Sequence, residues 1–539
     1  MTRLVEEPQA EEADAIRAGD TILGIELGST RIKAQLIDRN HRPIAAGAFE
    51  WSSRFVDGNW TYPLDAVWGG LQACYADLVA DVERRFSVTP SRYAAIGVSG
   101  MMHGYLAFDA EGALLTPFRT WRNTTAEAAS VELTSLFKRH IPQRWSISHL
   151  YQAVLNDEPH VENIDFLTTL AGYVHWRLTG LKVLGAGDAS GMFPIDPASH
   201  DWDSAKVAVF DQLVAPTHPH LHLDGILPQP LLAGQPAGNL TVEGAGLLDP
   251  TGTLEPGIPL CPPEGDAGTG MVATNSVAAR TGNISVGTSI FAMVVLERPL
   301  STPHREIDLV VTPSGDPVAM VHCNNGANEL AEWASVFTRF SAAAHQSTNR
   351  DEVFAILLKE ALAGQPDGGG LLAYNFITGE PIAGVTDGRP MLLRTPGSQL
   401  TLANLMRVQV YSMFGALSLG LQILASEGVA IDAMYAHGGV FKTEGVAQRL
   451  LAAAIGAPVS VSETASEGGS WGMAVLAAYH LAVREGSTLP LTDYLATRVL
   501  ADSQVIVLSP DPDDVAGYSR FLDRYRKGLA VEQSARIII

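Results

Sequence analysis

The sequence predicts an α/β protein built from two domains of similar design. Its 539 residues exceed what a single hydrophobic core usually supports. Two distant segments share one pattern, in which an apolar strand meets a small Gly-Ser/Thr turn and continues as a second apolar strand. The first copy lies at residues 24–30 and the second at 284–289. Strand and helix patterns restart after residue 282, so we place the domain boundary near residue 280.

The first predicted domain covers residues 21–280 and follows an acidic N-terminal tail at 1–20, which we expect to be solvated. It opens with a meander of three strands that ends near residue 50. A helix is predicted over 64–86, because its apolar residues recur at the spacing of one buried face. Later elements are a buried strand at 93–99 and a helix at 161–178 that ends at Gly180.

The second predicted domain covers residues 281–539 and repeats the strand, turn and strand of the first. Its long helices are expected at 400–426, at 445–455 and near 515–527. The most apolar stretch, 410–425, contains serines, glycines and a glutamine and is too short to cross a membrane. It therefore reads as a buried core helix.

Charge and cysteine content limit the partners and the compartment. The formal net charge of −22 argues against nucleic acid or an anionic membrane as a partner, because both would be repelled. A polyanionic ligand would need backbone donors, a few cations and a divalent metal. The three cysteines are far apart and lie in apolar settings, so we expect no disulfide framework and a cytoplasmic protein.

The two glycine-containing turns predict a phosphate clamp. Glycine leaves room for an oligophosphate, while N–H groups and the hydroxyls of Ser29, Thr30, Thr288 and Ser289 can donate to its oxygens. The alternative is an ordinary hairpin turn in each case. Nowhere does the sequence contain the GxxxxGK[ST] of a P-loop, so ATP would be bound in another way.

Asp266 is the candidate general base. It is the one carboxylate among small residues in Gly265-Asp266-Ala267-Gly268, where a short helix is expected to begin. A carboxylate with such an open approach can accept the proton of an alcohol that attacks a γ-phosphoryl group. The local pattern fits a helix N-cap equally well.

Two further segments follow buried strands. Met101-Met102-His103-Gly104 comes at the carboxyl end of its strand, where open α/β sheets bind ligands, and a histidine there can donate to a sugar hydroxyl. A packed core histidine is the alternative. Gly438-Gly439-Val440-Phe441 follows another strand and could let an adenine or ribose approach the backbone.

Taken in order, these motifs resemble those of the FGGY carbohydrate kinases, members of the actin and sugar kinase superfamily, from residue 21 to about 529. The resemblance rests on six segments: Gly24-Ile25-Glu26-Leu27-Gly28-Ser29-Thr30, Gly97-Val98-Ser99-Gly100-Met101-Met102-His103-Gly104, Gly265-Asp266, Gly287-Thr288-Ser289, Gly379-Glu380-Pro381, and Gly438-Gly439-Val440-Phe441-Lys442-Thr443 with Glu467-Gly468-Gly469-Ser470-Trp471-Gly472.

The resemblance implies two RNase H-like (actin-like ATPase) domains flanking a central cleft, and transfer of a phosphate from ATP with Mg²⁺ to a sugar. It implies that the 21–280 domain binds the sugar and that the 281–539 domain binds adenosine. Asp266 would be the general base and would contact the sugar together with Met102, His103, Trp121 and Asn123. The residues implied for ATP are Gly28, Ser29, Thr30, Lys33, Gly287, Thr288, Ser289, Gly438, Gly439 and Gly472.

The chain departs from the family pattern at two positions. Glu26 stands where the family usually has Asp, so its carboxylate would meet Mg²⁺ through water with altered geometry. In Trp121-Arg122-Asn123, a neutral amide replaces the family's acidic sugar contact. These departures put the metal geometry and the sugar specificity in question.

The expected function is phosphorylation of a ketopentose, L-ribulose or D-xylulose, in pentose catabolism. Alternatives are a kinase of glycerol, erythritol or gluconate, and a nucleotide-dependent sensor that transfers no phosphate. The expected partner is a small sugar, with neither nucleic acid nor membrane involved. A homodimer is compatible with the sequence, through the 438–442 loop and the C-terminal helix.

Overall fold

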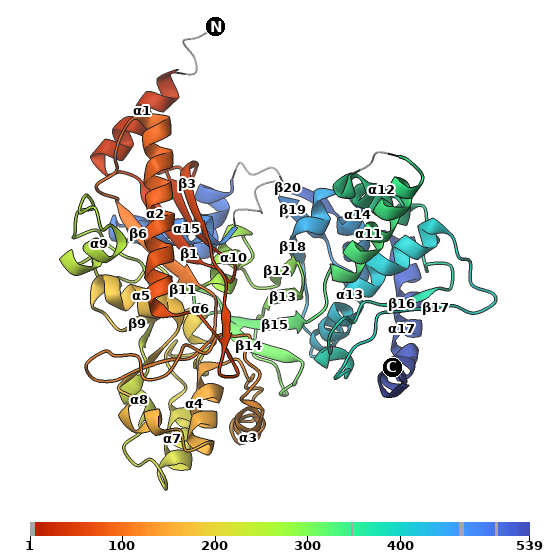
Figure 1. Ribbon diagram of the computed structural model, residues 1–539, viewed down its shortest axis with the longest axis horizontal. Coiled ribbons are helices and arrows are strands. Elements are labelled where there is room, and N and C mark those ends of the chain that lie inside the picture. The colour runs from red at the N-terminus through yellow and green to blue at the C-terminus, as the bar shows by residue number, and fades with distance from the viewer. Residues whose placement is uncertain (1–5, 347–348, 463–467, 502–504, 539) are drawn as a thin grey trace. The chain divides into compact units, whose positions relative to one another are not determined.

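The computed structural model is a mixed α/β protein and describes residues 6–346, 349–462, 468–501 and 505–538 (Figure 1). These residues form two compact units. Unit 1 comprises the described parts of Met1–Val277, Leu309–Val318 and Glu467–Asp502. Unit 2 comprises the described parts of Ala278–Asp308, Ala319–Ser466 and Ser503–Ile539. The units are thus not two consecutive halves of the chain, since its late segment 468–501 packs in unit 1.

A five-stranded sheet forms the centre of unit 1, in the order β11-β6-β1-β2-β3. Its strands are β1 (Ile22–Leu27), β2 (Arg31–Ile37), β3 (Pro43–Glu50), β6 (Ala95–Gly100) and β11 (Glu264–Gly265). The first three strands pair antiparallel, as the predicted meander requires, whereas β6 runs parallel to both β1 and β11. The carboxyl ends of β1, β6 and β11 therefore lie at one edge of the sheet.

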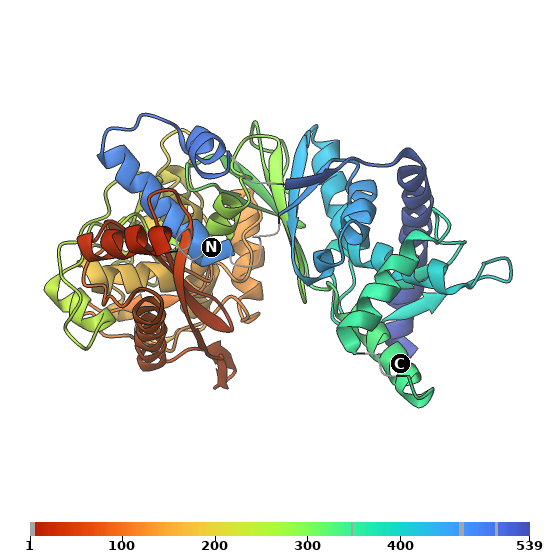
Figure 2. The same cartoon turned by 90° about the horizontal axis from the view of Figure 1, so that it is seen from above.

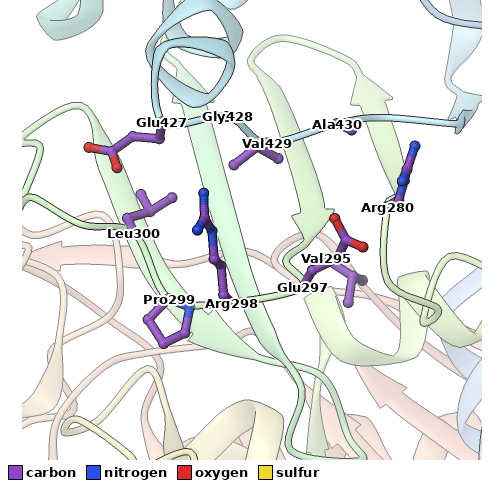
Figure 3. Close-up of a pocket in the computed structure, with 10 residues that line it drawn as sticks. All are labelled: Arg280, Val295, Glu297, Arg298, Pro299, Leu300, Glu427, Gly428, Val429 and Ala430. Atoms are coloured by element: carbon purple, nitrogen blue, oxygen red, sulfur yellow. The ribbon is translucent and has the colours of Figure 1, made fainter.

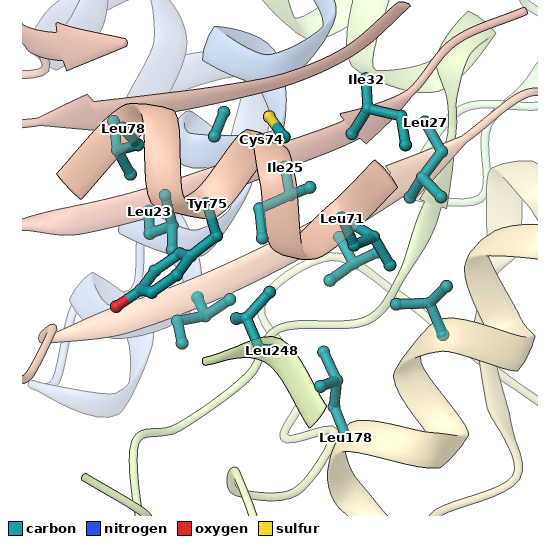
Figure 4. Close-up of a cluster of buried hydrophobic side chains, with 14 of the residues drawn as sticks. Leu23, Ile25, Leu27, Ile32, Leu71, Cys74, Tyr75, Leu78, Leu178 and Leu248 are labelled. Atoms are coloured by element: carbon teal, nitrogen blue, oxygen red, sulfur yellow. The ribbon is translucent and has the colours of Figure 1, made fainter. Parts of the chain in front are cut away.

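The alternation of residues along β1 explains how the sheet is covered. Leu23, Ile25 and Leu27 are buried in the same core cluster as the apolar residues of α2 (Leu64–Phe86), a helix whose predicted bounds are confirmed (Figure 4). Gly24 lies on the opposite face, where a Cβ would come within 2.2 Å of the Ser470 carbonyl oxygen of α15 (Gly468–Arg484). Figures 1 and 2 show the blue α15 beside the red and orange strands of unit 1.

The remaining elements of unit 1 surround this sheet. The helices are α1 (Glu6–Ala18), α3 (Glu127–Phe137), α4 (Ser146–Leu155), η1 (Pro159–Asn163), α5 (Leu170–Thr179), α6 (Ala186–Ala189), α7 (Ser204–Val214), α8 (Leu223–Ile226), α9 (Val242–Leu248), α10 (Asp266–Ala273), α16 (Leu491–Tyr494) and η5 (Leu495–Val499). The short strands are β4 (Arg54–Val56), β5 (Asn59–Thr61), β7 (Leu106–Phe108), β8 (Phe166–Thr168), β9 (Val183–Gly185) and β10 (Gln229–Leu231).

Two predictions for unit 1 need correction. The described part of the N-terminal segment, from residue 6, is not a solvated tail, because α1 buries Ala13 and Ile16 in the core that α2 also lines. The helix expected at 161–178 begins only at Leu170, because β8 pairs with β7 and the Thr169 side chain then caps the helix by accepting from the Gly172 N–H. Its end is as predicted, since Gly180 adopts the left-handed conformation.

The sheet of unit 2 has seven strands and shares the central strand pairings of unit 1. The order is β14-β15-β13-β12-β18-β19-β20, and residues 309–318 of the β14–β15 hairpin group with unit 1. The strands are β12 (Thr281–Val286), β13 (Ile290–Val295), β14 (Ile307–Val311), β15 (Pro317–Cys323), β18 (Ala433–His437), β19 (Val459–Ser462) and β20 (Val505–Leu508). As in unit 1, the first strand pairs antiparallel with the second and parallel with a later strand.

Long helices cover the sheet of unit 2. They are α11 (Asn328–Ala343), α12 (Arg350–Leu362), α13 (Leu402–Ser426), α14 (Val446–Ile455) and α17 (Pro512–Ile538), with β16 (Leu372–Tyr374), β17 (Met391–Leu393), η2 (Pro381–Ala383) and η3 (Gly439–Lys442) between them. In the described part of the chain, α13 alone is long and apolar enough to cross a membrane, and 78% of its most apolar window is buried. The predicted core helix is thereby confirmed.

All three cysteines are free and buried, which agrees with the prediction that the chain has no disulfide framework.

Candidate active site

Asp266 lies at the sheet edge where β6 and β11 end. It is the first residue of α10 and is half-buried, and its Oδ1 accepts a hydrogen bond from the backbone N–H of Met102 over 3.1 Å. Burial raises the pKa of Asp266, while hydrogen bonds from Met102 and Ala267 oppose the shift. A carboxylate with a raised pKa at such an edge has the properties of a general base.

His103 follows Met102 in a left-handed backbone conformation, with φ of 70°. Its side chain is buried, and Nδ1 lies 3.1 Å from the carbonyl oxygen of Gly191. Only an N–H can pair with a carbonyl, so Nδ1 carries the proton and Nε2 is an acceptor in the neutral ring. The imidazole stacks on Trp145, with ring centroids 6.4 Å apart. A neutral His103 therefore accepts from a hydroxyl at Nε2 and donates there only when protonated.

The Trp121-Arg122-Asn123 segment of this unit has two exposed residues followed by a buried asparagine. Trp121 is 36% exposed, and its Nε1–H donates to the Ser29 hydroxyl over 3.1 Å. Asn123 is buried, and its amide accepts from the Trp60 N–H at 2.7 Å and donates to the carbonyl oxygens of Trp60 and Thr120. The Asn123 amide thus ties this segment to β5, while Trp121 joins it to the first glycine-containing turn.

The first predicted phosphate turn, Gly28-Ser29-Thr30, joins β1 to β2, and all three of its carbonyl oxygens accept hydrogen bonds. Trp51 donates from Nε1 to Gly28 over 2.7 Å and from its backbone N–H to Thr30 over 3.1 Å. The Tyr62 hydroxyl donates to the carbonyl of Ser29 over 2.5 Å. Carbonyl dipoles repel phosphate oxygens, so engaging them within the unit favours an anion at this turn.

Glu26 lies one residue before the end of β1, on the face that contacts α15. It pairs in register with Lys33 of β2, and a Cβ on Gly469 would lie 2.0 Å from its Oε1. Burial raises the pKa of Glu26 to about 7; Lys33 and the backbone N–H of Ser470 lower it, and Asp266 raises it. The Glu26 carboxylate therefore lies against the start of α15 and is close enough to Asp266 for the two negative charges to repel each other.

Gly472 has a packing role in α15. A Cβ at this position would lie 2.2 Å from the carbonyl oxygen of Thr269 in α10, so only glycine allows the two helices to approach this closely. Unit 1 thus contains Glu26, Gly28, Ser29, Thr30, Lys33, Met102, His103, Trp121, Asn123, Asp266 and Gly472 of the predicted site residues.

Unit 2 contains the other five predicted site residues, Gly287, Thr288, Ser289, Gly438 and Gly439. Residues 287–289 form the turn between β12 and β13, and Gly438 directly follows β18, the parallel neighbour of β12. Gly438 has φ of 128°, and a Cβ there would lie 2.0 Å from the Val286 carbonyl oxygen. Gly439 faces open space instead. Both segments therefore lie at one edge of the unit 2 sheet.

Several polar residues that support these elements carry no local sequence signal. Tyr62 and Trp51 hold the first turn, and Glu264 lies behind Asp266, where its Oε1 accepts from the Gly265 N–H over 2.9 Å. The fully buried Asp188 receives a hydrogen bond from Thr169 and has a pKa well above the ordinary range, through burial and through the nearby Glu264 and Asp266 carboxyls. These contacts join residues distant in sequence, so spacing alone could not reveal them.

A surface pocket lies elsewhere in unit 2 (Figure 3). It is lined by Arg280, Val295, Glu297, Arg298, Pro299, Leu300, Glu427, Gly428, Val429 and Ala430, none of which is a predicted site residue. Glu427 is already bound by Ser301, Thr302 and His304, and Arg280 pairs with Asp432. We assign this pocket no part in the candidate active site.

The solved structures that share this fold include several sugar kinases. A xylulose kinase from Lactobacillus acidophilus superposes with a TM-score of 0.77 at 18% identity, covering 96% of this chain and 99% of that structure. A gluconate kinase from the same organism gives the same TM-score, identity and coverage. The fold is therefore that of proteins with two actin-like ATPase domains.

Sequence comparison then identifies the family. The models of the N-terminal and C-terminal domains of the "FGGY family of carbohydrate kinases" match residues 21–266 and 282–481. The chain belongs to the FGGY family of carbohydrate kinases, as its motifs predicted. Among curated relatives, the xylulose kinase of Haemophilus influenzae is 22% identical over 436 residues, which are 78% of this chain and 83% of that protein.

Proposed function

We propose that this sugar kinase transfers the γ-phosphate of ATP to a hydroxyl of a ketopentose, with Asp266 as the general base. The observation that carries the proposal is the hydrogen bond from the Met102 N–H to the Asp266 carboxylate at 3.1 Å. It places the candidate base beside the Met102-His103 segment, at the end of parallel strands where α/β sheets bind ligands.

The chain's own residues have distinct parts in this proposal. Asp266 accepts the proton of the sugar hydroxyl while the hydroxyl oxygen bonds to the γ-phosphorus and ADP leaves. His103 and Met102 orient the sugar, and Trp121 offers an exposed aromatic face to it. Each glycine-containing turn offers N–H and hydroxyl donors to phosphate oxygens within its own unit, and Lys33 adds positive charge beside the first turn.

The residues present fit ATP and Mg²⁺. Carbonyl oxygens of both turns are engaged within their units, which suits bound phosphate. Mg²⁺ neutralises developing phosphate charge and is usually held by one or two carboxylates, water and substrate phosphate. Glu26, whose carboxylate feels that of Asp266, is the residue we expect to meet the ion through water. Gly438, Gly439 and Gly472 belong to the segments proposed for the adenosine end.

The choice between L-ribulose and D-xylulose depends on a few donors and acceptors in the sugar pocket. The Met102-His103 segment and the xylulose kinase relatives favour a ketopentose. A second candidate is a kinase of another polyol or sugar acid, such as glycerol, erythritol or gluconate. It is favoured by Asn123, because an amide engaged with the Trp60 backbone stands where the family's acidic sugar contact is expected.

The test is ADP release from Mg-ATP with a panel of acceptors: L-ribulose, D-ribulose, D-xylulose, L-xylulose, ribitol, erythritol, glycerol and gluconate. Asp266→Asn is the blank, because an amide cannot accept the proton, and its turnover should fall by at least a hundredfold. We expect one ketopentose to respond strongly. Response to a polyol alone would support the second candidate, and ATP binding without any response would favour a sensor.

A further inference from the structure

The second predicted phosphate turn in unit 2 is held from its carbonyl side by the segment that precedes α11. The Gly326 N–H donates to the Thr288 carbonyl over 2.7 Å, and the Ala327 N–H donates to the Gly287 carbonyl over 2.9 Å. The contact is so close that a Cβ on Gly326 would lie 2.2 Å from the Gly287 oxygen. The position of the turn therefore depends on the position of residues 326–327.

Asn325 fixes that segment through every polar atom of its side chain. Its Oδ1 accepts from the backbone N–H groups of Ile377 and Thr378, at 2.9 and 3.0 Å. Its Nδ2 donates to the Thr378 carbonyl over 3.2 Å and to Glu380 Oε2 over 3.1 Å. The side chain is 5% exposed. A buried amide engaged in this way fixes the backbone on both sides of the contact.

Glu380 holds Asn325 in place through two hydrogen bonds to its Oε2. Its side chain has no exposed surface, and its Oε2 also accepts from the Asn325 backbone N–H over 3.2 Å. Burial raises the pKa of Glu380 to about 7, which hydrogen bonds from Asn325 oppose. Asn375 completes the support by donating to the Gly326 carbonyl over 2.9 Å. A single connected network thus links residues 375–380 to the turn.

This network has a specific consequence for a phosphate ligand. A carbonyl oxygen that turned toward a phosphate would repel it, whereas an N–H or hydroxyl attracts it. Fixing the Gly287 and Thr288 carbonyls against residues 326–327 keeps the turn in an orientation in which Thr288 is exposed. The first turn is fixed in the same sense by Trp51 and Tyr62, although the supporting residues are unrelated.

We infer that Asn325 is a positioning residue for nucleotide binding, which holds the Gly287-Thr288-Ser289 turn in its phosphate-binding orientation with Glu380 as its support. The inference rests on the proposed function only in taking ATP as the ligand of this turn. Asn325 acts through residues 326–327 and touches no reacting atom.

The first test compares two buried asparagines of unit 2. Asn325→Ala should raise KM for ATP by about tenfold while KM for the sugar stays within twofold, because loss of a buried hydrogen-bond partner commonly costs that much. Asn404→Ala is the matched control. Asn404 is 2% exposed and also joins backbone segments, by accepting from Gln365 over 2.7 Å and donating to Gln399 over 2.9 Å. It should leave KM for ATP unchanged.

A second test exchanges the donor and the acceptor of the hydrogen bond between Asn325 and Glu380. Asn325→Asp places two carboxyl groups against each other and should weaken binding of Mg-ATP, measured by calorimetry, by at least tenfold. Adding Glu380→Gln restores an amide opposite a carboxylate and should recover most of the affinity. This rescue distinguishes a positioning role from a general loss of stability. The double variant changes more of the buried network than either single variant, so a general loss of stability would make its affinity worse and not better.

Equal KM values for ATP in Asn325→Ala and Asn404→Ala, or an affinity of Asn325→Asp that Glu380→Gln does not recover, would overturn the inference. The proposed function fails by a different result, namely that the wild-type protein binds Mg-ATP yet phosphorylates no sugar in the panel. The calorimetric comparison of the Asn325 variants still decides the inference in that case.

Discussion

The Met102 N–H and the Asp266 carboxylate are hydrogen-bonded over 3.1 Å, although 163 residues separate them in the sequence. The bond joins the carboxyl ends of two neighbouring parallel strands, β6 and β11. The candidate base is therefore fixed by the backbone of the same segment that carries His103.

The raised pKa of Asp266 predicts how catalysis depends on pH. Burial favours the protonated carboxyl, and a protonated Asp266 cannot accept the proton of the sugar hydroxyl. We therefore expect kcat/KM to fall on the acid side, with an apparent pKa above that of an ordinary aspartate. The residual rate of Asp266→Asn should lack this acid limb. Asp65→Asn, in the exposed first turn of α2, should keep the wild-type profile.

Tyr62→Phe should weaken nucleotide binding without unfolding unit 1. The change removes the hydroxyl that donates to the Ser29 carbonyl, so the first turn loses one of its three carbonyl partners. We expect KM for ATP to rise about fivefold and the melting temperature to change little. Tyr93→Phe is the control, because it removes another buried hydroxyl of unit 1, which donates to Tyr75. An equal KM in the two variants would contradict the assigned role.

Asn123→Asp, which restores the acid typical of the family, should destabilise this protein. The Asn123 amide donates to the carbonyl oxygens of Trp60 and Thr120, and a carboxylate would place negative charge against both. We expect a loss of about 2 kcal/mol in the free energy of unfolding, measured with urea. The exposed Asn40→Asp should change it by less than about 0.5 kcal/mol. Unchanged stability of Asn123→Asp would show that the amide does not anchor this segment.

Gly472→Ala should destabilise unit 1, because its Cβ would lie 2.2 Å from the Thr269 carbonyl and force α15 away from α10. Overpacking of this kind costs about 1–3 kcal/mol. Gly69→Ala is the matched helical control, since a Cβ there meets no atom within 4 Å in the exposed part of α2. It should stabilise the protein by about 1 kcal/mol. The melting temperatures of both variants distinguish the cost of a steric clash from the gain in helix propensity, because only Gly472→Ala should lower the melting temperature.

The sequence predicted what local pattern determines. The apolar spacing of α2, the meander around Gly28, the end of α5 at Gly180 and the buried α13 all follow from periodicity and turn chemistry. The prediction failed where tertiary contacts determine the structure. The N-terminal segment is acidic and was expected to be solvated, but its Ala13 and Ile16 side chains are buried in the core of unit 1. The roles of Tyr62 and Asn325 were also beyond prediction, because each depends on a contact between distant segments: Tyr62 with the Ser29 carbonyl, and Asn325 with residues 377–380.

The raised pKa of Glu264 should make the free energy of unfolding depend on pH. Glu264 is 2% exposed behind Asp266, and a Cβ on Gly185 or Gly187 would lie 2.7 or 2.5 Å from its carboxylate oxygens. Burial raises its pKa from 4.5 to about 7, although N–H groups of Gly265, Asp188 and Gly187 oppose the shift. The folded state therefore binds the Glu264 proton more tightly than the unfolded state does. This contribution to stability is fully present below pH 4.5 and is lost as pH rises through 7.

Between pH 5.5 and 8, ionisation of Glu264 should lower the free energy of unfolding of the wild-type protein by about 2 kcal/mol. Glu264→Gln has no proton to lose, so the difference between wild type and variant should change by that amount over this range. Asp249→Asn is the control, because Asp249 is also buried and accepts hydrogen bonds from backbone N–H groups, but its pKa is lowered and it stays ionised throughout. Urea unfolding at both pH values measures the differences. A parallel pH slope in the wild type and Glu264→Gln would mean that the Glu264 carboxylate stays ionised in the fold, stabilised fully by its N–H donors.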